Sequence, residues 1–418
     1  MEAFEITGGI PLYGEVQIQG SKNAALPILA AAVLIEGTTV LYNCPRIIDI
    51  TYMIQILEYL GCIVTWEDTN ILRIDASNIT GTVIPESCAN KMRSSITLLG
   101  SLLGRKKSAK MPYPGGCVIG DRPIGMHLQA LEQMGVVIET EESWLYASAD
   151  RLTGTKVLFQ KNSVGATENA ILAAVLAEGV TCITGAAKEP EITELCRFLK
   201  NAGAEIAGIG TDQLIINGVK RLKETSYKIV SDRIVAGTYL FAVAATKGDA
   251  ILKDVPSGQL AGVISVAREM GIAVKEEGNS LFISAKDGIC AVPYVETKEY
   301  PGFPTDLQSV LISALALAEG KSIVKEMIFD ARFRTAKELR RMGADIRIDE
   351  KKNTAFLTGV PKLFGTDVYA KELRGGAALA VAGLAADGLT KVHNLYYIRR
   401  GYENIERDLR SLGGNIRG

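Results

Sequence analysis

The chain repeats one structural unit six times, and this repetition constrains its fold more than any other feature of the sequence. A short segment with apolar residues at helical spacing ends in an apolar residue and a glycine. It recurs as "IQILEYLGC", "LQALEQMGV", "CRFLKNAGA", "SVAREMGI", "AKELRRMGA" and "IERDLRSLGG". The glycines are Gly61, Gly135, Gly203, Gly271, Gly343 and Gly413, spaced 68 to 74 residues apart. This pattern predicts six amphipathic helices, each stopped by a glycine C-cap.

Each repeat also contains a second helical segment, which is rich in alanine and leucine. Examples are "NAALPILAAAVLIEG", "ATENAILAAVLAEG", "DLQSVLISALALAEG" and "GGAALAVAGLAADG". These segments are apolar on nearly every face, which predicts buried helices. A β-like run follows each kind of helix, for example "GCIVTWED" after the first kind and "TTVLYN" after the second. The repeat is therefore predicted to be strand–helix–strand–helix–strand–strand.

The size of the repeats predicts two domains. Six units of about 70 residues are too large for a solenoid of short repeats, and 418 residues exceed one ordinary domain. Three repeats per domain give two α/β domains of roughly 200 residues, with buried helices inside a ring of sheets. The boundary is expected near "YKIVSDRIVAG", about residue 230. A cleft between the domains is the default ligand site.

Composition excludes several classes of function. The net charge of −1 gives no electrostatic footprint for nucleic acid or for a membrane surface. The seven cysteines show neither a CxxC pair nor zinc-ligand spacing, so reduced thiols are expected and no metal or cofactor is predicted. The N-terminal residues lack the pattern of a signal peptide, and the apolar runs are too short to cross a bilayer. A cytoplasmic protein is expected.

The segment "GSKNAALPILAA" is the first candidate for anion binding. Ser21, Lys22 and Asn23 directly precede a predicted helix. Backbone N–H groups and the helix dipole attract anions at such a position, and the lysine adds a full positive charge. The segment lacks the spacing of a Walker loop. The alternative interpretation is a serine N-cap followed by a solvated lysine.

The segment "PYPGGCVIGDRPIGMH" places Cys117 in a Gly/Pro-rich loop that is flanked by cations. Nearby positive charge lowers the pKa of a thiol and increases its thiolate fraction. Such a thiol can act as an acid, a base or a nucleophile. The alternative is a loop cysteine with no chemical role. The flanking cations are Lys106, Lys107, Lys110 and Arg122.

Two further features complete the candidate chemistry. In "YPGFPTDLQSV", Asp306 enters a helix after a stiff turn, so it is either an N-terminal carboxylate of that helix or a rigidly held general base. Arginines recur at similar loop positions of different repeats. They are either surface salt-bridge partners or a cleft for a strongly anionic substrate. The arginines are Arg93, Arg122, Arg233, Arg332, Arg374 and Arg400.

Motifs along nearly the whole chain resemble those of the enolpyruvyl transferase family, in particular its UDP-N-acetylglucosamine branch. The motifs are "GSKNAALPILAA", "MRSS", "PGGC", "RPIGMH", "SVGAT", "EPEI", "DRI", "FPTD", "FDARF", "LRGGAAL" and "RGYENIE". The resemblance implies an inside-out α/β barrel fold with two domains, each of three repeats. Residues 22–230 would form the first domain and residues 1–21 with 231–418 the second, the N-terminal strand crossing into the second.

The resemblance also implies a reaction and its residues. Enolpyruvate would pass from phosphoenolpyruvate to the 3′-hydroxyl of UDP-N-acetylglucosamine, releasing phosphate, in the first committed step of peptidoglycan synthesis. Cys117 would be the general acid and the target of fosfomycin, and Asp306 the base. Phosphoenolpyruvate would contact Lys22, Asn23, Arg122, Arg374 and Arg400. The nucleotide sugar would contact Arg93, Arg122, Pro123, Ile124, Gly125, Met126, Ser163, Val164, Gly165, Asp306 and Ile328. A monomer without a cofactor is expected.

Three positions depart from the family's motifs. Gly125 replaces the usual aspartate of the "RPxDxH" motif, Val235 replaces a glutamate after "DRI", and Gly375 replaces an alanine after Arg374. These changes affect the expected affinity for the nucleotide sugar more than the proton chemistry. Two alternatives stay open: the sister reaction on shikimate 3-phosphate, and a catalytically silent protein that binds UDP-sugars.

Overall fold

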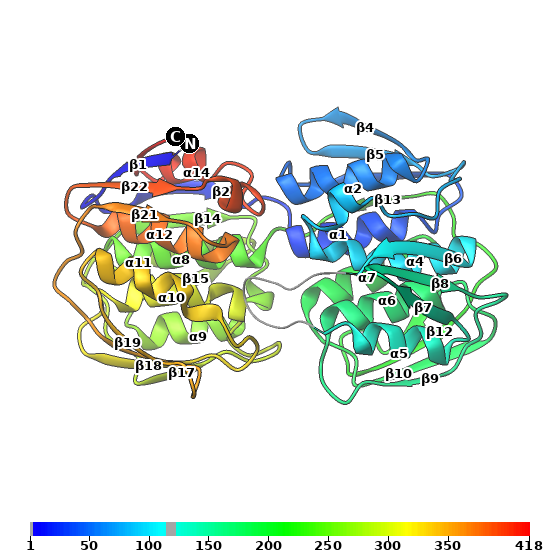
Figure 1. Ribbon diagram of the computed structural model, residues 1–418. Coiled ribbons are helices and arrows are strands. Elements are labelled where there is room, and N and C mark those ends of the chain that lie inside the picture. Colours follow the sequence, from blue (N-terminus) through cyan, green and yellow to red (C-terminus); the bar gives the residue numbers. More distant parts are fainter. Residues whose placement is uncertain (1–2, 114–122) are drawn as a thin grey trace. The chain divides into compact units, whose positions relative to one another are not determined.

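The computed structural model describes residues 3–113 and 123–418 and contains two compact units. Unit 1 includes residues 3–19 and Ser231–Gly418, and unit 2 includes residues 20–113 and 123–230. The chain therefore starts in unit 1, crosses to unit 2 after Gln19 and returns at Ser231. Figure 1 shows this path as dark blue and green-to-red ribbon in unit 1 and blue-to-green ribbon in unit 2.

The six predicted glycine-capped helices are all present. Each ends just before its glycine, which has a φ between +80° and +103°, a range that only glycine adopts easily. A strand follows each glycine, as predicted. The helices are α2 (Ile48–Tyr59), α5 (Gly125–Gln133), α7 (Pro190–Asn201), α9 (Ala261–Glu269), α11 (Thr335–Arg341) and α14 (Ile405–Ser411).

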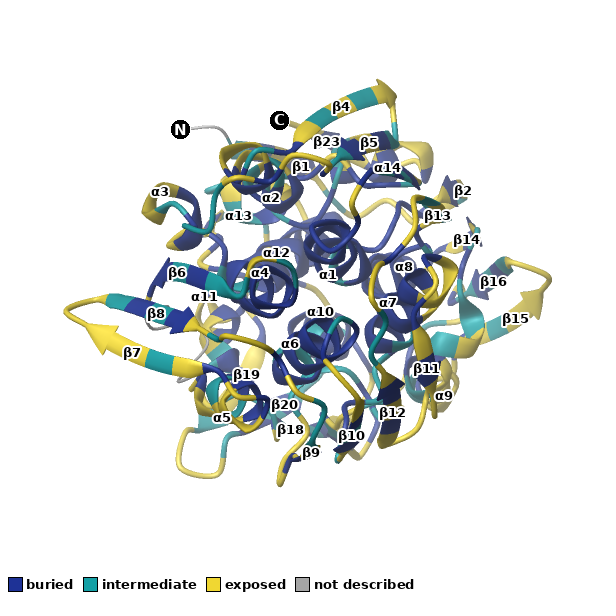
Figure 2. Cartoon of the chain, turned by 90° about the vertical axis from the view of Figure 1, so that its right-hand side faces the viewer, coloured by how far each residue is buried: buried dark blue, intermediate teal, exposed yellow. Residues whose placement is uncertain are grey.

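The alanine- and leucine-rich segments form a second set of helices, and these are buried as predicted. All thirteen residues of α8 are buried, and α1 is buried from Ala24 onward. In Figure 2 these helices are dark blue along most of their length, whereas outer strands such as β7 carry exposed residues. The set comprises α1 (Lys22–Ala32), α4 (Leu98–Lys106), α6 (Val164–Ala174), α8 (Arg233–Ala245), α10 (Gln308–Leu315) and α12 (Leu373–Ala385).

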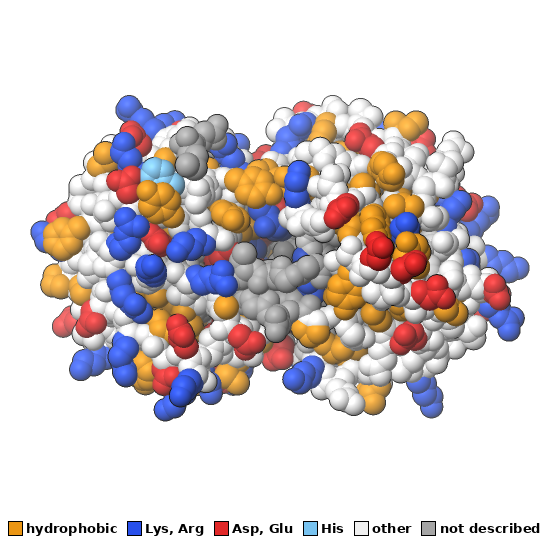
Figure 3. All heavy atoms as spheres, in the orientation of Figure 1, with side chains coloured by type: hydrophobic (Ala, Val, Ile, Leu, Met, Phe, Trp, Pro, Cys, Tyr) orange, Lys and Arg blue, Asp and Glu red, His pale blue; other side chains and the backbone are white. Residues whose placement is uncertain are grey.

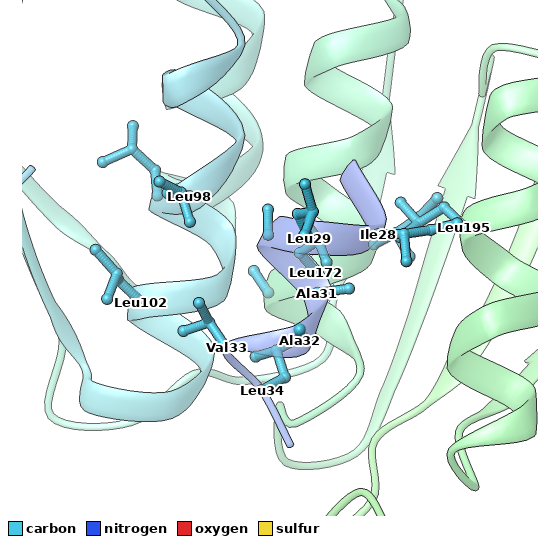
Figure 4. Packing of buried hydrophobic residues seen from close by; sticks show 14 of the residues in the cluster. Ile28, Leu29, Ala31, Ala32, Val33, Leu34, Leu98, Leu102, Leu172 and Leu195 are labelled. Carbon is cyan, nitrogen blue, oxygen red and sulfur yellow. The ribbon is translucent and has the colours of Figure 1, made fainter. Parts of the chain in front are cut away.

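These helices form the core of each unit. In unit 1, α8, α10 and α12 pack on one another. In unit 2, α4 packs against both α1 and α6, and α1 also packs on α7. Figure 4 shows Leu29 of α1 beside Leu172 of α6, with Ile28 facing Leu195 of α7. Small alanines on α1 let the neighbouring helices approach closely, which explains why the pattern is apolar all round rather than striped.

Six small sheets cover the helices. In unit 2 they are β13 (Thr225–Lys228), β3 (Thr38–Tyr42), β5 (Ile71–Asp75) and β4 (Ile63–Asp68); β6 (Ser108–Pro112), β8 (Trp144–Ser148) and β7 (Val137–Glu141); and β11 (Glu205–Ala207), β12 (Gln213–Asn217), β10 (Val180–Thr184) and β9 (Lys156–Leu158). In unit 1 they are β15 (Ala273–Glu277), β16 (Ser280–Ser284), β14 (Asp249–Lys253) and β2 (Tyr13–Gln17); β17 (Tyr294–Glu296), β18 (Lys321–Lys325), β20 (Thr354–Thr358) and β19 (Asp345–Asp349); and β21 (Asp367–Tyr369), β22 (Leu389–His393), β1 (Ala3–Thr7) and β23 (Asn415–Arg417).

The four-stranded sheets share one topology, in which a parallel pair continues into antiparallel partners. The second repeat differs, because Val83 makes a single parallel bridge to Lys110 where the other repeats have a full strand. Short helical segments extend the repeats. They are α3 (Glu86–Ala89), α13 (Tyr396–Arg399) and the 3-10 helices η1 (Arg93–Thr97), η2 (Ser257–Gln259), η3 (Thr305–Leu307) and η4 (Arg332–Arg334).

Strand exchange between distant parts of the chain completes three sheets. Strand β2, which precedes α1 of unit 2, pairs in parallel with β14 of unit 1. Strand β13, which precedes α8 of unit 1, pairs in parallel with β3 of unit 2. Strand β1 lies between β22 and β23, antiparallel to both. Unit 1 is therefore completed by the N-terminal strands β1 and β2, and unit 2 by β13 at the C-terminal end of its own stretch of sequence.

The surface matches the balanced composition. On the face shown in Figure 3, lysine and arginine side chains are interspersed with aspartate and glutamate on both units. Among the helices of the described residues, none is long and apolar enough to cross a membrane.

Candidate active site

In unit 1, Asp306 is held by two buried arginines. Its Oδ1 accepts a hydrogen bond from Arg332 Nη2 at 2.7 Å, and its Oδ2 accepts one from Arg374 Nη2 at 3.0 Å. The arginine side chains are 3% and 5% exposed, against 26% for Asp306. Asp306 lies in the first turn of η3, as predicted if it is an N-terminal carboxylate of a helix. Its carboxylate, however, accepts hydrogen bonds from arginines of η4 and α12.

Arg374 is a permanent buried cation. Burial alone would lower its pKa, but Asp306, Tyr402 and Asp232 outweigh this effect and raise the pKa above the usual value of arginine. Asp232 is the N-cap of α8, where its Oδ1 accepts from the backbone N–H of Ile234 and Val235. Burial raises the pKa of Tyr402, whose hydroxyl lies 2.8 Å from that of Thr238. Arg374 therefore stays charged at any working pH.

Donors remain available around this carboxylate. Arg374 Nη1 and Arg332 Nε are buried and have no hydrogen-bond partner within the described ranges. A buried guanidinium donor without an acceptor is costly unless a ligand or water satisfies it. The unit 1 site thus keeps two buried guanidinium donors, one from each arginine, for which a ligand or water could supply acceptors.

In unit 2, Lys22 forms a buried ion pair with Asp49. Lys22 Nζ lies 2.7 Å from Asp49 Oδ2, and the side chains are 12% and 2% exposed. Ser21 is the N-cap of α1 and accepts from the N–H of Ala24 at 3.3 Å. The alternative interpretation of this segment is confirmed for Ser21, which is the N-cap of α1. Its prediction of a solvated lysine is wrong, because Lys22 is paired with Asp49 and largely shielded from solvent. Asp49, in the first turn of α2, was missed because nothing in "IIDITYM" distinguishes it from an ordinary helix N-terminal carboxylate.

Cations occupy the N-terminal turns of three buried helices. Lys22 begins α1, Arg233 begins α8, and Arg374 is the second residue of α12. A positive side chain is unfavourable at the positive end of a helix dipole, by roughly 0.3–1 kcal/mol at exposed sites. Retaining cations there places positive charge at the start of α1 in unit 2 and at the starts of α8 and α12 in unit 1, and such charge attracts anions.

The residues expected at the nucleotide sugar lie at helix starts of unit 2. Ile124 is the buried N-cap of α5, Gly125 and Met126 begin that helix, and Pro123 precedes it. Ser163 is the N-cap of α6 and accepts from Ala166 N–H at 3.3 Å, followed by Val164 and Gly165. Arg93 begins η1.

His127 connects these helix starts. A Cβ atom at Gly165 would lie only 2.9 Å from the imidazole of His127, so only glycine fits beside the ring. Asn169 of α6 lies 2.8 Å from His127 Nδ1, donates to Ile96 O and accepts from Gly100 N–H. The structure thus brings the starts of α5 and α6 together with the end of η1. Sequence reasoning missed Asn169, because a lone buried asparagine carries no motif.

The remaining expected site residues are placed as follows. Arg400 caps the C-terminal end of α13 in unit 1, and Asn23 is the second residue of α1 in unit 2. Ile328 donates its N–H to Glu326 Oε1 at 2.8 Å. Cys117 and Arg122 lie outside the described residues.

The three departures have different environments. Gly125 is exposed and a Cβ there would meet no atom within 4 Å, so the usual aspartate would fit. Val235 is fully buried in α8. A Cβ at Gly375 would overlap Thr335 Oγ1 and come within 2.8 Å of Glu372 Oε1, so glycine is required by its neighbours.

Four of the six described cysteines are buried. Cys44, Cys62, Cys88, Cys182, Cys196 and Cys290 are all free thiols. Burial raises the pKa of both Cys62 and Cys196 to about 12, which suppresses their reactivity. Within residues 3–113 and 123–418, no three His, Cys, Asp or Glu side chains are grouped as metal ligands would be.

The family model for EPSP synthase (3-phosphoshikimate 1-carboxyvinyltransferase) matches residues 6–409. This chain belongs to that family. It is 47% identical over 416 residues to UDP-N-acetylglucosamine 1-carboxyvinyltransferase 2 of Caldanaerobacter subterraneus subsp. tengcongensis, an alignment that covers 100% of this chain and 99% of the relative. It is 43% identical to the UDP-N-acetylglucosamine 1-carboxyvinyltransferase of Clostridium botulinum, with the same coverage.

Solved structures share the fold of this family member. The enolpyruvyl transferase NikO from Streptomyces tendae superposes with a TM-score of 0.87 at 24% identity, covering 99% of this chain and 98% of NikO. EPSP synthase from Acinetobacter baumannii superposes with a TM-score of 0.75 at 19% identity, covering 100% and 99%. The predicted α/β fold is confirmed, and closure of each domain into a barrel stays a prediction.

Proposed function

We propose that this chain transfers enolpyruvate from phosphoenolpyruvate to the 3′-hydroxyl of UDP-N-acetylglucosamine and releases phosphate, as the first committed step of peptidoglycan synthesis in the cytoplasm. The observation that carries the proposal is identity of 42–47% along the whole chain to relatives that are named for this reaction. Identity to the EPSP synthase structure is only 19%. The nucleotide-sugar branch of the family is therefore favoured over the shikimate branch.

The donor carries a phosphate and a carboxylate, so it needs several cations. Lys22, Arg122 and Arg400 are the proposed partners, with Arg374 near the carboxylate. Arginine binds such groups through two parallel hydrogen bonds, and lysine acts as a point charge. Lys22 is already paired with Asp49, which holds the ammonium at the start of α1. Phosphoenolpyruvate would therefore bind a Lys22 ammonium that Asp49 already holds in place.

Cys117 and Asp306 are the proposed acid and base. The thiol protonates C3 of the donor, which makes C2 electrophilic, and the sugar hydroxyl adds to C2 while Asp306 accepts its proton. The resulting tetrahedral ketal loses phosphate as the C3 proton leaves. The two arginines of unit 1 donate to different oxygens of this carboxylate and so fix its orientation. Each proton transfer contributes typically 10²–10⁴-fold.

The test of the overall reaction is release of phosphate by the purified protein. Phosphoenolpyruvate with UDP-N-acetylglucosamine should release phosphate, and pre-incubation with fosfomycin should abolish the release. Cys117→Ala should prevent labelling by fosfomycin, which assigns the effect to that thiol. Binding of the nucleotide sugar without turnover would instead support a catalytically silent UDP-sugar-binding protein.

The role of Asp306 has its own test. Asp306→Asn keeps the shape of the side chain but removes the base and the charge partner of two arginines, so kcat should fall about 10²-fold or more. Arg332→Lys, which keeps a cation beside the carboxylate, is the matched control and should lose less activity. Turnover of Asp306→Asn at the wild-type rate would remove Asp306 from the base role.

A second function is favoured by one observation, the description of the matching family model as EPSP synthase. It predicts phosphate release with shikimate 3-phosphate in place of the nucleotide sugar. The same assay therefore separates the two functions, since only one acceptor should support turnover.

A further inference from the structure

Glu326 is a buried carboxylate that the reaction described above does not use. It is 2% exposed and follows β18 directly. Its oxygens accept four hydrogen bonds. Oε1 accepts from Thr297 Oγ1 at 2.8 Å and from the backbone N–H groups of Ile328 and Phe329 at 2.8 and 3.2 Å. Oε2 accepts from Thr305 Oγ1 at 2.9 Å.

The four donors come from three separate segments of unit 1. Thr297 follows β17, the parallel neighbour of β18, so Thr297 and Glu326 lie at the same edge of this sheet. Thr305 begins η3 and immediately precedes the proposed base Asp306. Ile328, a proposed contact of the nucleotide sugar, lies two residues beyond Glu326. One side chain therefore joins the turn of the base to the loop of the acceptor.

Further hydrogen bonds tie the same loop down. Thr297 Oγ1 also accepts from Met327 N–H at 2.9 Å. Asn353, in the turn before β20, donates to the carbonyls of Glu326 and Phe329 at 2.9 and 2.8 Å. The hydrogen-bond donors to the Glu326 carboxylate among the described residues are all neutral groups. Glu326 thus holds the segments of Thr297, Thr305 and Ile328 in fixed positions through the hydrogen bonds that it accepts.

We propose that Glu326 is a positioning residue, which sets the distance between the base Asp306 and the acceptor-binding loop at Ile328. This inference rests on the proposed function. A base must lie within hydrogen-bond reach of the proton that it takes, and a displacement of about 1 Å can cost about 10²-fold in rate. A single carboxylate that accepts from both segments removes that freedom. Glu326 itself touches neither substrate.

The hydrogen-bond pattern predicts which substitutions are tolerated. In Glu326→Gln, the amide oxygen can replace Oε1, and the NH2 group can donate to Thr305 if its hydroxyl rotates. In Glu326→Leu, a side chain of similar size accepts nothing. We expect kcat and both KM values of the glutamine variant within about 3-fold of wild type. The leucine variant should show a kcat lowered at least about 10-fold, a raised KM for UDP-N-acetylglucosamine, and an unchanged KM for phosphoenolpyruvate.

Two threonine variants separate the two halves of the connection. Thr305→Val removes only the link to the base, so it should lower kcat about 10-fold with little change in the KM for the nucleotide sugar. Thr297→Val removes the link to the loop, so it should mainly raise that KM. These variants also keep the proposal testable if Glu326→Leu fails to fold.

Asp408→Asn is the structural control. Asp408 is a buried carboxylate of the same unit that accepts from Tyr239 Oη at 2.8 Å, outside the proposed machinery. It should lower Tm and leave the kinetic constants within about 2-fold of wild type. Equal kinetics for wild type and the Thr305→Val and Thr297→Val variants would overturn the proposal, as would a Glu326→Gln variant as impaired as Glu326→Leu. Absence of wild-type turnover would instead refute the proposed function, and this inference with it.

Discussion

The start of α12 shows how single residues set the position of a proposed ligand group. Glu372 caps this helix through the N–H groups of Arg374 and Gly375. Because the cap and the arginine are two residues apart, the cap fixes the backbone from which Arg374 reaches Asp306. Gly375 leaves room for this arrangement, since a side chain there would collide with Thr335 Oγ1 and the capping carboxylate.

Replacing Gly375 by alanine should therefore destabilise the protein. Helix propensity alone favours alanine by up to about 1 kcal/mol, but overpacking against Thr335 and Glu372 costs about 1–3 kcal/mol and should dominate. Urea unfolding of Gly375→Ala measures the net loss. In Gly375→Ala combined with Thr335→Ala, part of the stability should return, because one of the two collisions is relieved. Equal stability of Gly375→Ala and wild type would contradict this account.

Much of the candidate site was visible in the sequence, but its pairings were not. Lys22, Asp306 and Arg374 stand in recognisable motifs. Their partners lie far away in the sequence, and only the packing of the helices decides that Arg374, 68 residues beyond Asp306, reaches its carboxylate. The same holds for Asp49 and Glu326, which stand in no recognisable motif. Their roles depend on the residues that folding brings next to them, such as Lys22 beside Asp49 and Thr305 beside Glu326.

At the scale of elements, the glycines that end the six outer helices share a left-handed backbone but differ in their surroundings. Gly61 and Gly203 have almost the same φ, +103° and +101°. A Cβ at Gly203 would meet nothing within 4 Å, whereas one at Gly61 would lie 2.9 Å from Asn78 O. Comparing alanine substitutions at Gly203 and Gly61 therefore separates two contributions to the loss of stability. One is the strain of a left-handed backbone, and the other is the steric clash of the added methyl group.

Both glycine-to-alanine variants should destabilise unit 2, and Gly61→Ala should do so more. The left-handed conformation costs alanine roughly 1–2 kcal/mol, which is the whole effect expected for Gly203→Ala. The contact with Asn78 adds about 1 kcal/mol or more at Gly61. Trp66 and Trp144, the two tryptophans of the chain, both belong to unit 2, so their fluorescence during urea unfolding measures the difference. Equal losses would show that the Asn78 loop yields without cost.

The order of elements was the most predictable part of the fold. A period of about 70 residues identified both kinds of helix and the strands after them, because buried helices and glycine caps have recognisable patterns in the local sequence. The pairing of strands has no such local sequence pattern. The exchange of β2 and β13, and the place of β1 between β22 and β23, depend on contacts between distant segments. Only the family resemblance implied that the N-terminal strand crosses over.

At the scale of the whole molecule, buried thiols make stability depend on alkaline pH. The pKa of Cys62 and of Cys196 rises from about 9 to about 12 on folding. Between these values the unfolded chain loses both protons and the folded chain keeps them. Their contribution is therefore fully present below pH 9 and is lost as the pH rises toward 12. The slope is at most about 1.4 kcal/mol per pH unit for each thiol.

Unfolding of unit 2 should accordingly become easier from pH 9 to pH 10.5, and the double variant Cys62→Ala, Cys196→Ala should show a smaller dependence on pH. The variant loses stability at pH 7.5 because two buried side chains are shortened, so the comparison concerns slopes and not absolute values. Tryptophan fluorescence in urea at pH 7.5, 9 and 10.5 provides the measurement. Cys290→Ala, at an exposed position, is the control. A slope unchanged by the double substitution would refute the assignment.

The strand exchange also has a consequence for biosynthesis. Strands β1 and β2 leave the ribosome early, yet their partners β22, β23 and β14 are made after all of unit 2. Unit 2 can close once β13 has emerged, whereas unit 1 must keep its opening strands unpaired until translation nears the C-terminal strand. During that interval β1 and β2 expose backbone N–H and C=O groups that can pair with other chains. Nascent chains stalled before β22 should therefore depend most on chaperones.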